Sequence, residues 1–328
     1  MMRRRQLSLI VASAALAAPA LARAQGGPWP TRPVRIINPY APGGASDIII
    51  RPLTEKLERV FGRPFVVENR PGAGGSVGTA AAAAERPDGY TLLVSNTGPL
   101  AVAPALFPSL AYDPLRAFTW ITMLGGAPIV CAVKGDDGPI RSMPDYLEQA
   151  RRRVEEVSFG SSGVGSAGHL TGVLFGMETG TQLLHVPFRG AGEAQQAVLS
   201  GQTTSLWDTL GANVAAIRGG NLRGLAVSTA ERVGALPDLP TLRELGFPGV
   251  VSTNWFLLAA PAGLDPDIAG RLRAAVQEAL AEPAARERLE GVGIVSLGTP
   301  APAEIGAFVE RETARWGAVV RTAGVRPA

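Results

Sequence analysis

Cysteine and histidine are almost absent from this chain. Its 328 residues include one cysteine, Cys131, and two histidines, His169 and His185. A single cysteine permits no internal disulfide and no cysteine-based metal site, and the H-E-x-x-H pattern of zinc proteases does not occur. Cys131 lies in the apolar segment 129–133, so we interpret it as a small, buried hydrophobic side chain. The sequence therefore predicts neither a metal site nor a zinc enzyme.

Two enzyme motifs occur only in part. Gly163, Gly165 and Gly168 spell G-x-G-x-x-G before a helix-like run, but the acidic residue that holds a ribose about 20 positions later is missing. Ser162 has Gly160 two positions before it but Val164 two positions after it, so the G-x-S-x-G nucleophile motif is incomplete. We therefore expect no nucleotide cofactor. The glycine-rich loop still opens a helix, whose unpaired N–H groups and positive dipole end favour an anion.

The first 24 residues have the pattern of a cleavable export signal. Arginines occupy positions 3–5, an apolar, alanine-rich stretch follows over residues 7–21, and residues 22–24 read Ala-Arg-Ala. The apolar stretch is shorter than the roughly 20 residues that a membrane span needs. We predict cleavage after Ala24, which leaves a mature chain of roughly 300 residues. Both the general and the twin-arginine export routes remain open.

Basic residues are scarce once this signal is removed. The whole chain has a formal charge of +3, and the signal contains four arginines and no acid. The run at residues 151–153 is followed by acidic residues at 155 and 156, which is typical of a solvated helix face. No basic stripe remains, so we expect no nucleic-acid partner.

Short apolar strands alternate with helical patterns along the mature chain. We expect strands at residues 34–37, 65–67, 90–94, 157–159, 183–186, 204–207 and 222–227, and helices at 46–61, 79–84, 170–179, 191–200, 268–280, 284–289 and 302–320. Ser46 is a candidate N-cap and Gly62 a candidate C-terminal glycine of the first helix. This order predicts an α/β fold with a parallel sheet covered by helices on both faces.

Residues 121–134 and 251–260 are apolar and extended, and they interrupt the alternation. We interpret them as two strands that cross between domains. The prediction is a first domain made of residues 25–125 and 255–328, into which a second domain of residues 126–254 is inserted. Both domains are expected to be α/β.

A series of short motifs runs along the chain in a fixed order. They are Pro42-Gly43-Gly44 with Asp47, Val67-Glu68-Asn69-Arg70-Pro71-Gly72-Ala73-Gly74-Gly75, Pro87-Asp88-Gly89-Tyr90, Tyr112-Asp113-Pro114, Gly160-Ser161-Ser162-Gly163-Val164-Gly165-Ser166, His185-Val186-Pro187-Phe188-Arg189-Gly190, Leu236-Pro237-Asp238-Leu239-Pro240, and Glu312 with Arg315-Trp316. In type and order they resemble the Bug family, the solute-binding proteins of tripartite tricarboxylate transporters. The resemblance covers nearly all of the mature chain.

The resemblance implies a periplasmic binding protein of type II (Venus flytrap) architecture, with a ligand cleft between two domains. It implies that the chain is not an enzyme, binds a small carboxylate without a cofactor, and delivers it to an integral-membrane permease. One strand-to-helix loop from each domain, here residues 40–47 and 161–166, would hold the carboxylate through backbone amides and water. We expect a monomer.

The resemblance and the helix starts together give the candidate ligand-binding residues. They are Tyr40, Gly43, Gly44, Ala45, Ser46, Asp47, Ser161, Ser162, Gly165, Ser166, His169, Phe188 and Asp208. Several have structural alternatives: Gly43 and Gly44 could serve only a tight turn, and Asp47 could serve only the helix dipole. Phe188 stands where the family commonly has a tyrosine, so one cleft hydroxyl is missing.

Two other functions remain open at this stage. The same fold and site could belong to a periplasmic sensor subunit that reports a ligand to a two-component kinase. A hydrolase using a serine with His169 and an acid is the second alternative, although no nucleophile motif supports it.

Overall fold

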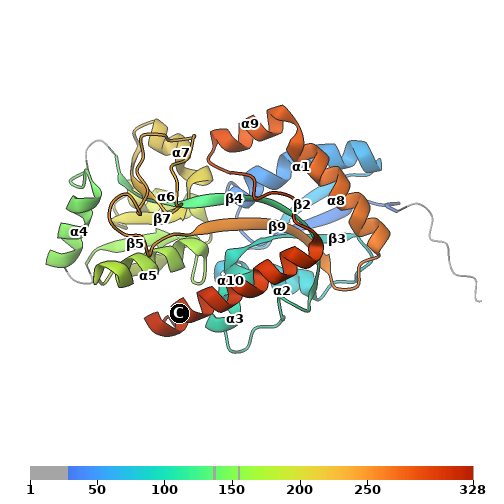
Figure 1. The fold of residues 1–328 in the computed structure, drawn as a ribbon, viewed down its shortest axis with the longest axis horizontal. Helices are drawn as coiled ribbons and strands as arrows, with labels where there is room; N and C mark the ends of the chain where they lie inside the picture. The colour runs from blue at the N-terminus through green and yellow to red at the C-terminus, as the bar shows by residue number, and fades with distance from the viewer. Residues whose placement is uncertain (1–28, 136–137, 154–155, 328) are drawn as a thin grey trace, which may run out of the picture.

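Nine strands and the helices that connect them form the described part of the chain, residues 29–135, 138–153 and 156–327 of a computed structural model (Figure 1). The strands are Val34–Asn38 (β1), Phe65–Asn69 (β2), Thr91–Asn96 (β3), Phe118–Lys134 (β4), Ser158–Ser161 (β5), Leu184–Pro187 (β6), Ser205–Thr209 (β7), Leu222–Val227 (β8) and Thr253–Pro261 (β9). The predicted signal peptide lies outside the described residues.

The α-helices are Ala45–Phe61 (α1), Ser76–Ala83 (α2), Ala103–Leu106 (α3), Met143–Arg152 (α4), Ala167–Thr179 (α5), Ala191–Leu199 (α6), Leu210–Arg218 (α7), Pro266–Ala281 (α8), Pro283–Gly291 (α9) and Pro302–Ala323 (α10). Short helical turns at Ala73–Gly75 (η1) and Gly98–Val102 (η2) complete them. Among the described residues, no helix is long and apolar enough to cross a membrane.

The strands form a mixed sheet in the order β2-β1-β3-β9-β4-β7-β5-β6, with β8 also paired to β4. The predicted parallel pairing is correct for β1 with β2 and β3, and for β5 with β6 and β7. The crossing strands, for which no direction was predicted, are antiparallel to their neighbours: β9 runs antiparallel to β3 and β4, and β4 runs antiparallel to β7 and β8. β4 and β9 carry the chain in opposite directions along the molecule, so they pair antiparallel.

The two crossing strands divide the molecule into two lobes. β4 pairs with β9 from Phe118 to Pro128 and with β7 from Ile129 onwards. We call β1, β2, β3, β9 and residues 118–128 of β4, with their helices, the first lobe, and residues 129–134 of β4 with β5–β8 and their helices the second lobe. Figure 1 shows β4 and β9 running lengthwise from one lobe towards the other.

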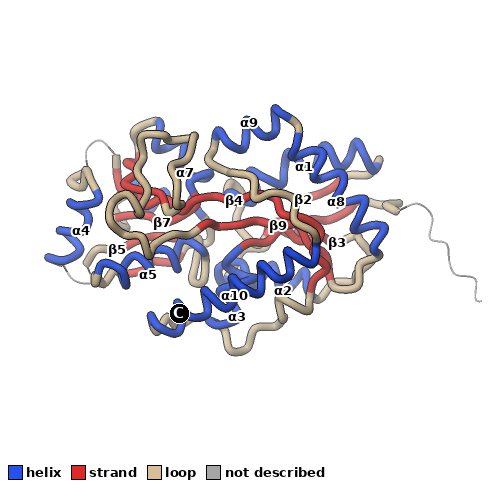
Figure 2. Tube along the Cα trace, in the orientation of Figure 1, coloured by secondary structure: helices blue, strands red, loops and turns tan. Residues whose placement is uncertain are grey.

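Each lobe has a hydrophobic core on both faces of its sheet. Figure 2 shows helices flanking the strands. In β9, Phe256 and Leu258 pack towards α1 and α8, while Leu257 and Ala259 pack towards α10. This period of two is that of a strand buried on both faces. Cys131 is fully buried in the second lobe, as predicted.

The ends of the first helix differ in part from the prediction. Gly62 follows α1 with a φ of 68° and donates its N–H to the Glu58 carbonyl, so the predicted C-terminal glycine is correct. The predicted N-cap is wrong: Gly44 holds that position, and the Ser46 hydroxyl donates to Asn38 Oδ1 at 2.8 Å. Because the helix already begins at Ala45, Ser46 lies within its first turn.

Candidate functional site

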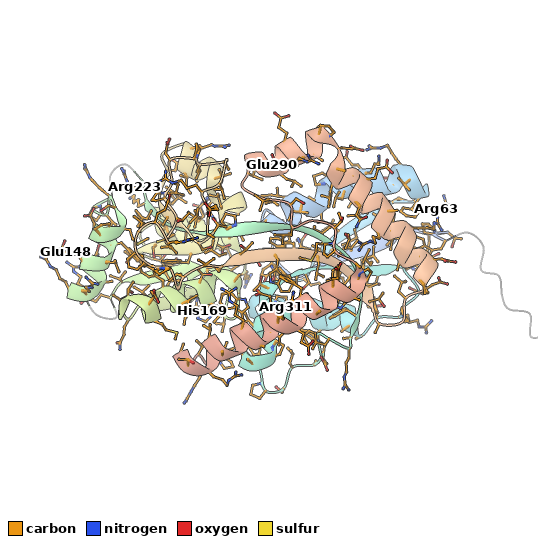
Figure 3. All side chains as sticks on the ribbon, viewed as in Figure 1. Arg63, Glu148, His169, Arg223, Glu290 and Arg311 are labelled. Atoms are coloured by element: carbon orange, nitrogen blue, oxygen red, sulfur yellow. The ribbon has the colours of Figure 1, made fainter. Side chains whose placement is uncertain are left out.

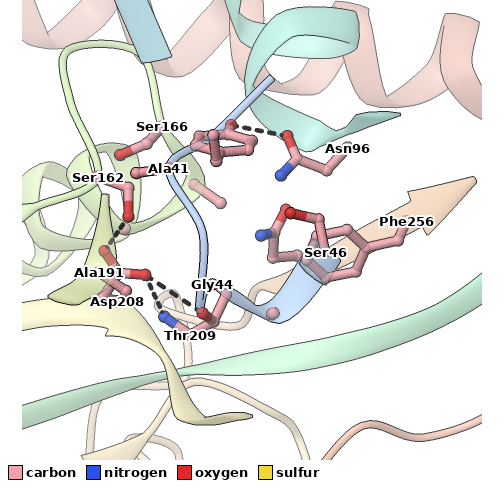
Figure 4. A pocket seen from close by; sticks show the side chains of 15 residues that line it. Ala41, Gly44, Ser46, Asn96, Ser162, Ser166, Ala191, Asp208, Thr209 and Phe256 are labelled. Atoms are coloured by element: carbon pink, nitrogen blue, oxygen red, sulfur yellow. Dashed lines mark hydrogen bonds between the residues drawn. The ribbon is translucent and has the colours of Figure 1, made fainter. Parts of the chain in front are cut away.

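A small pocket lies between the lobes, where four helices begin (Figure 4). Its lining residues are Tyr40, Ala41, Gly44, Ala45, Ser46, Asn96, Ser162, Ser166, Ala167, Gly168, Ala191, Asp208, Thr209, Asn254 and Phe256. The first residues of α1, α5 and α6, and Thr209, the N-cap of α7, are among them. First-turn N–H groups have no acceptor within their own helix, and each helix start carries a partial positive charge.

The electrostatic character of this pocket comes from backbone rather than from basic side chains. No lysine, arginine or histidine is among its lining residues in the part of the chain that the structure describes, and the ionisable side chains there are Tyr40 and Asp208. The open space is about 20 Å³, little more than the roughly 10–15 Å³ that one water molecule needs. This space is too small for a molecule much larger than water.

Asp47 organises the first loop instead of facing the pocket. Its carboxylate accepts the Gly43 N–H at 3.0 Å, Arg51 Nε at 2.7 Å and Asn38 Nδ2 at 3.1 Å. Burial on its own raises the pKa of this carboxyl, but the bonds from Arg51, Gly43 and Asn69 outweigh burial, so the pKa lies below its ordinary value. Asp47 thereby fixes the turn that leads into α1.

Tyr40 connects the first loop to two other parts of its lobe. Its hydroxyl lies 2.8 Å from the Gly74 carbonyl and 2.9 Å from Asn96 Oδ1. Burial raises the pKa of this phenol well above its ordinary value, so Tyr40 remains protonated. The ring forms a wall of the pocket, while the hydroxyl is hydrogen-bonded within the first lobe.

The second loop is supported by a chain of hydroxyl groups. Ser166 is the N-cap of α5 and accepts the His169 N–H at 3.2 Å, as expected for a helix start. The Ser166 hydroxyl donates to Ser161 Oγ at 3.2 Å, and Ser161 Oγ lies 2.7 Å from His185 Nε2. Ser161 is fully buried, so it supports the loop from beneath.

Two stacked imidazoles lie behind this loop. The rings of His169 and His185 are 3.8 Å apart at 17°, and Figure 3 shows His169 at the end of α5 that faces the first lobe. Burial lowers the pKa of His169 to about 4, and burial together with the neighbouring His169 lowers the pKa of His185 further. His169 Nδ1 accepts the Gly165 N–H at 3.1 Å, so both rings are neutral supports of the loop.

Asp208 is the buried acid of the pocket, at the end of β7. It is 4% exposed. The Ser162 hydroxyl donates to its Oδ2 at 2.5 Å, and the Thr209 N–H donates to its Oδ1 at 2.7 Å (Figure 4). Burial raises its pKa above the ordinary value. No cation forms an ion pair with Asp208 among the described residues.

The structure brings only part of the predicted set into the pocket. The predicted residues that line it are Tyr40, Gly44, Ala45, Ser46, Ser162, Ser166 and Asp208. The others, Gly43, Asp47, Ser161, Gly165, His169 and Phe188, are absent from its lining. Phe188 lies against Gly160 and lines a neighbouring hollow with Gly74 and Val164, because β6 ends one strand further from the pocket than β5.

Several lining residues were not predicted from the sequence. Ala191 and Thr209 lie at the starts of helices that follow strands, so the reasoning used for the two recognised loops could have found them. Asn96 is the last residue of β3, so it has the strand end but not the helix start of that signal. Asn254 and Phe256 lie inside β9, and nothing in a buried strand marks which residue reaches a cleft.

Comparison with known proteins defines the class. Residues 49–325 match the model of the tripartite tricarboxylate transporter family receptor, and the chain belongs to this family. The chain is 36% identical to Protein BugT of Bordetella pertussis over 321 residues, which cover 98% of this chain and 97% of BugT. The matched family is one of receptors rather than enzymes.

Three solved structures share the fold. The periplasmic binding protein BugD has a TM-score of 0.86 at 31% identity, over 92% of this chain and 100% of BugD. The R. palustris protein Rpa4515 with adipate has a TM-score of 0.87 at 32% identity, over 92% and 100% of the two chains. MatC from Rhodopseudomonas palustris with bound malate has a TM-score of 0.83 at 32% identity, over 89% and 99%. The fold is therefore that of a periplasmic binding protein.

Proposed function

We propose that this protein captures a small carboxylate in the pocket between its lobes. The observation that carries the proposal is the meeting of four helix starts at one pocket that no basic side chain lines in the described chain. Such a site favours an anion through backbone N–H groups and helix dipoles. Adipate and malate in two similar structures support a carboxylate as the ligand class.

These groups are sufficient for useful affinity. A partly buried helix start contributes up to about 2 kcal/mol towards an anion, and a charge-assisted hydrogen bond contributes about 1.5–3 kcal/mol. Micromolar binding requires about 8 kcal/mol in total. Two loops that each donate two backbone N–H hydrogen bonds to the carboxylate can reach that value, after the costs of closure, without an arginine.

Capture proceeds by closure of two domains, residues 25–125 with 255–328 and residues 126–254. Both boundaries fall within the crossing strands, and β4 exchanges β9 for β7 and β8 just beyond the first boundary. A strand that changes partners can bend there while each lobe keeps its own core. Closure around the ligand excludes water and creates a surface that differs from that of the open form.

The closed protein delivers its ligand to the integral-membrane permease of a tripartite tricarboxylate transporter. It acts in the periplasm as a monomer, after cleavage behind Ala24. The family assignment supports the transporter role. N-terminal sequencing of protein from the periplasmic fraction tests the location: the sequence should begin at Gln25, and a chain retained in the cytoplasm with residues 1–24 would contradict it.

The binding proposal is tested by thermal unfolding of residues 25–328 with a panel of carboxylic acids that includes adipate and malate, each paired with its amide. A ligand at 100 times its Kd should add about 2.7 kcal/mol of stability. An acid that raises the Tm while its amide does not supports the proposal. Equal shifts by an acid and its amide, or no shift by any acid, would contradict it.

A further inference from the structure

Asp208 presents a contradiction within the proposed anion site. The pocket is lined by helix starts that attract an anion, yet it already contains a carboxylate that is 4% exposed. Its oxygens accept from neutral groups: the Ser162 hydroxyl, the Thr209 N–H and the Thr209 hydroxyl. A ligand carboxylate entering the same small pocket would place two like charges at close range, out of contact with water.

Two carboxylates that share a dry site cannot both remain ionised at low cost, and one of them takes up a proton. The alternative is a ligand that brings its own cation to pair with Asp208. The pocket disfavours that alternative, because four helix starts surround it and their positive dipole ends repel an ammonium group.

Building on the proposed function, we propose that capture of a carboxylate at this pocket takes up one proton, which Asp208 and the ligand carboxylate share. The proton comes from solvent as the lobes close, and no other bond is made or broken. The geometry of Ser162 suits this change. Its hydroxyl donates to Asp208 Oδ2 at 2.5 Å, and a hydroxyl both donates and accepts. When Asp208 is protonated, Oδ2 donates to Ser162 Oγ, and the Ser162 proton becomes available to the ligand.

None of the groups named below competes with Asp208 for the proton. Tyr40 faces it across the pocket, and its phenol remains protonated because burial and Asp208 itself raise its pKa. Val130 lies opposite Asp208 in β4 and is apolar. Ionisable groups in the first turns of three adjoining helices are held elsewhere: Asp47 of α1 by Arg51, His169 of α5 by the Gly165 N–H, and Glu193 of α6 by the Arg189 N–H. Arg218, the ionisable residue of α7, lies at the far end of that helix and donates to the Ala235 carbonyl.

Calorimetric titration in buffers of different ionisation enthalpy measures proton uptake directly. The probes are adipate, malate and glutamate, each added to residues 25–328. We expect uptake of close to one proton at pH 7 for the acid that binds. We also expect its Kd to rise, by up to about tenfold per pH unit, as pH rises from 6 to 8.

Asp208→Asn is the matched variant. Its amide has the shape of a protonated acid, accepting from Thr209 through Oδ1 and donating to Ser162 Oγ through Nδ2. We expect this variant to bind the same acid with no proton uptake and with a Kd that does not change between pH 6 and 8. Asp238→Asn removes the same charge at an exposed position and should behave as the wild type. Circular dichroism shows whether each variant is folded.

The outcomes separate this inference from the proposed function. If the wild type binds adipate or malate without proton uptake, the inference is wrong and the carboxylate site stands. If glutamate binds without proton uptake while adipate and malate do not bind, Asp208 pairs with the ligand ammonium, which also overturns the inference. If neither these three nor any other acid of the thermal-unfolding panel produces heat or a thermal shift, the proposed function fails and the inference fails with it.

Discussion

Gly74 and Val164 meet across the two lobes with no space for a side chain. A methyl group on Gly74 would lie 2.2 Å from the Val164 carbonyl oxygen, and Gly74 itself has a φ of 60°. Real methyl groups essentially never come closer than 3.0 Å to such an atom. The glycine-rich turn η1 of the first lobe therefore packs directly on the second-lobe loop that carries Ser162 and Ser166.

Gly74→Ala should prevent this closed arrangement. Opening of the lobes relieves the collision, so the variant remains folded but binds its carboxylate about tenfold more weakly or worse. Gly62→Ala is the control, since Gly62 has a φ of 68° and nothing within 4 Å; both variants share the backbone cost of roughly 1–2 kcal/mol. Small-angle scattering with and without ligand is the measurement. Ligand-induced compaction of Gly74→Ala equal to that of Gly62→Ala would contradict the closure contact.

Asp47→Asn should destabilise the protein near neutral pH. The variant loses the charged partner of Arg51 and weakens the bond to the Gly43 N–H, which costs about 1–3 kcal/mol. Because the folded pKa of Asp47 lies below its ordinary 3.8, this contribution is complete above that value and is lost as pH falls through the folded pKa. Urea unfolding at pH 7 and pH 3 measures it. A difference from wild type that grows on acidification would be inconsistent with the lowered pKa.

His185→Gln should flatten the acid dependence of stability. The pKa of a buried neutral imidazole is lowered in the folded state, so its contribution is complete above the ordinary 6.5 and declines as pH falls towards the folded value. The glutamine amide can still donate to Ser161 Oγ. Unfolding free energies at pH 7, 6, 5 and 4.5 should decline less steeply in the variant. Parallel curves for the two proteins would show that the imidazole pair is not titrating.

Glu312 on α10 accepts two indole N–H groups at one oxygen. Trp255 Nε1 lies 3.0 Å and Trp316 Nε1 3.1 Å from its Oε2. Glu312→Ala leaves both buried donors unpaired, and each costs about 1–3 kcal/mol. Glu310→Ala, an exposed change on the same helix, should cost little. Chemical unfolding followed by tryptophan fluorescence measures both, and equal stability of the two variants would argue against this role.

Much of the fold follows from local patterns in the sequence. The strand at Leu222–Val227 matches the predicted range, and Gly62 ends α1 as expected because its φ needs a glycine. Of the short helix α4, only its C-terminal end was predicted, through the solvated arginine run at residues 151–153; its start was not, although Ser142 caps it and Pro144 lies in its first turn. The antiparallel course of β4 and β9 depends on which strands lie beside them, and that is a long-range property that residue periodicity does not contain.

The candidate site was predicted mainly as two helix starts, and the same reasoning extends to the starts of α6 and α7. Loops that follow strands reveal which N–H groups are free, and this reasoning reaches Ala45 and Ser166 directly. The sequence does not reveal where the side chains turn. Asp47 and His169 lie in the first turns of the correct helices, but the Asp47 side chain turns to Arg51 and the His169 side chain to the Gly165 N–H. These directions are set by partners from elsewhere in the fold, as are the positions of Asn254 and Phe256.

The central claim, that backbone amides of the helix starts bind a carboxylate, is tested most directly by amide NMR. Residues 25–328, labelled with ¹⁵N and ²H, are titrated with the acid that gives the largest thermal shift and, in parallel, with its amide. We predict that the acid moves the amide protons of Ala45, Ser46, Ala167 and Gly168 downfield, as new hydrogen bonds to a carboxylate require, and that the amide does not. An acid that binds while these four protons keep their positions would contradict the account.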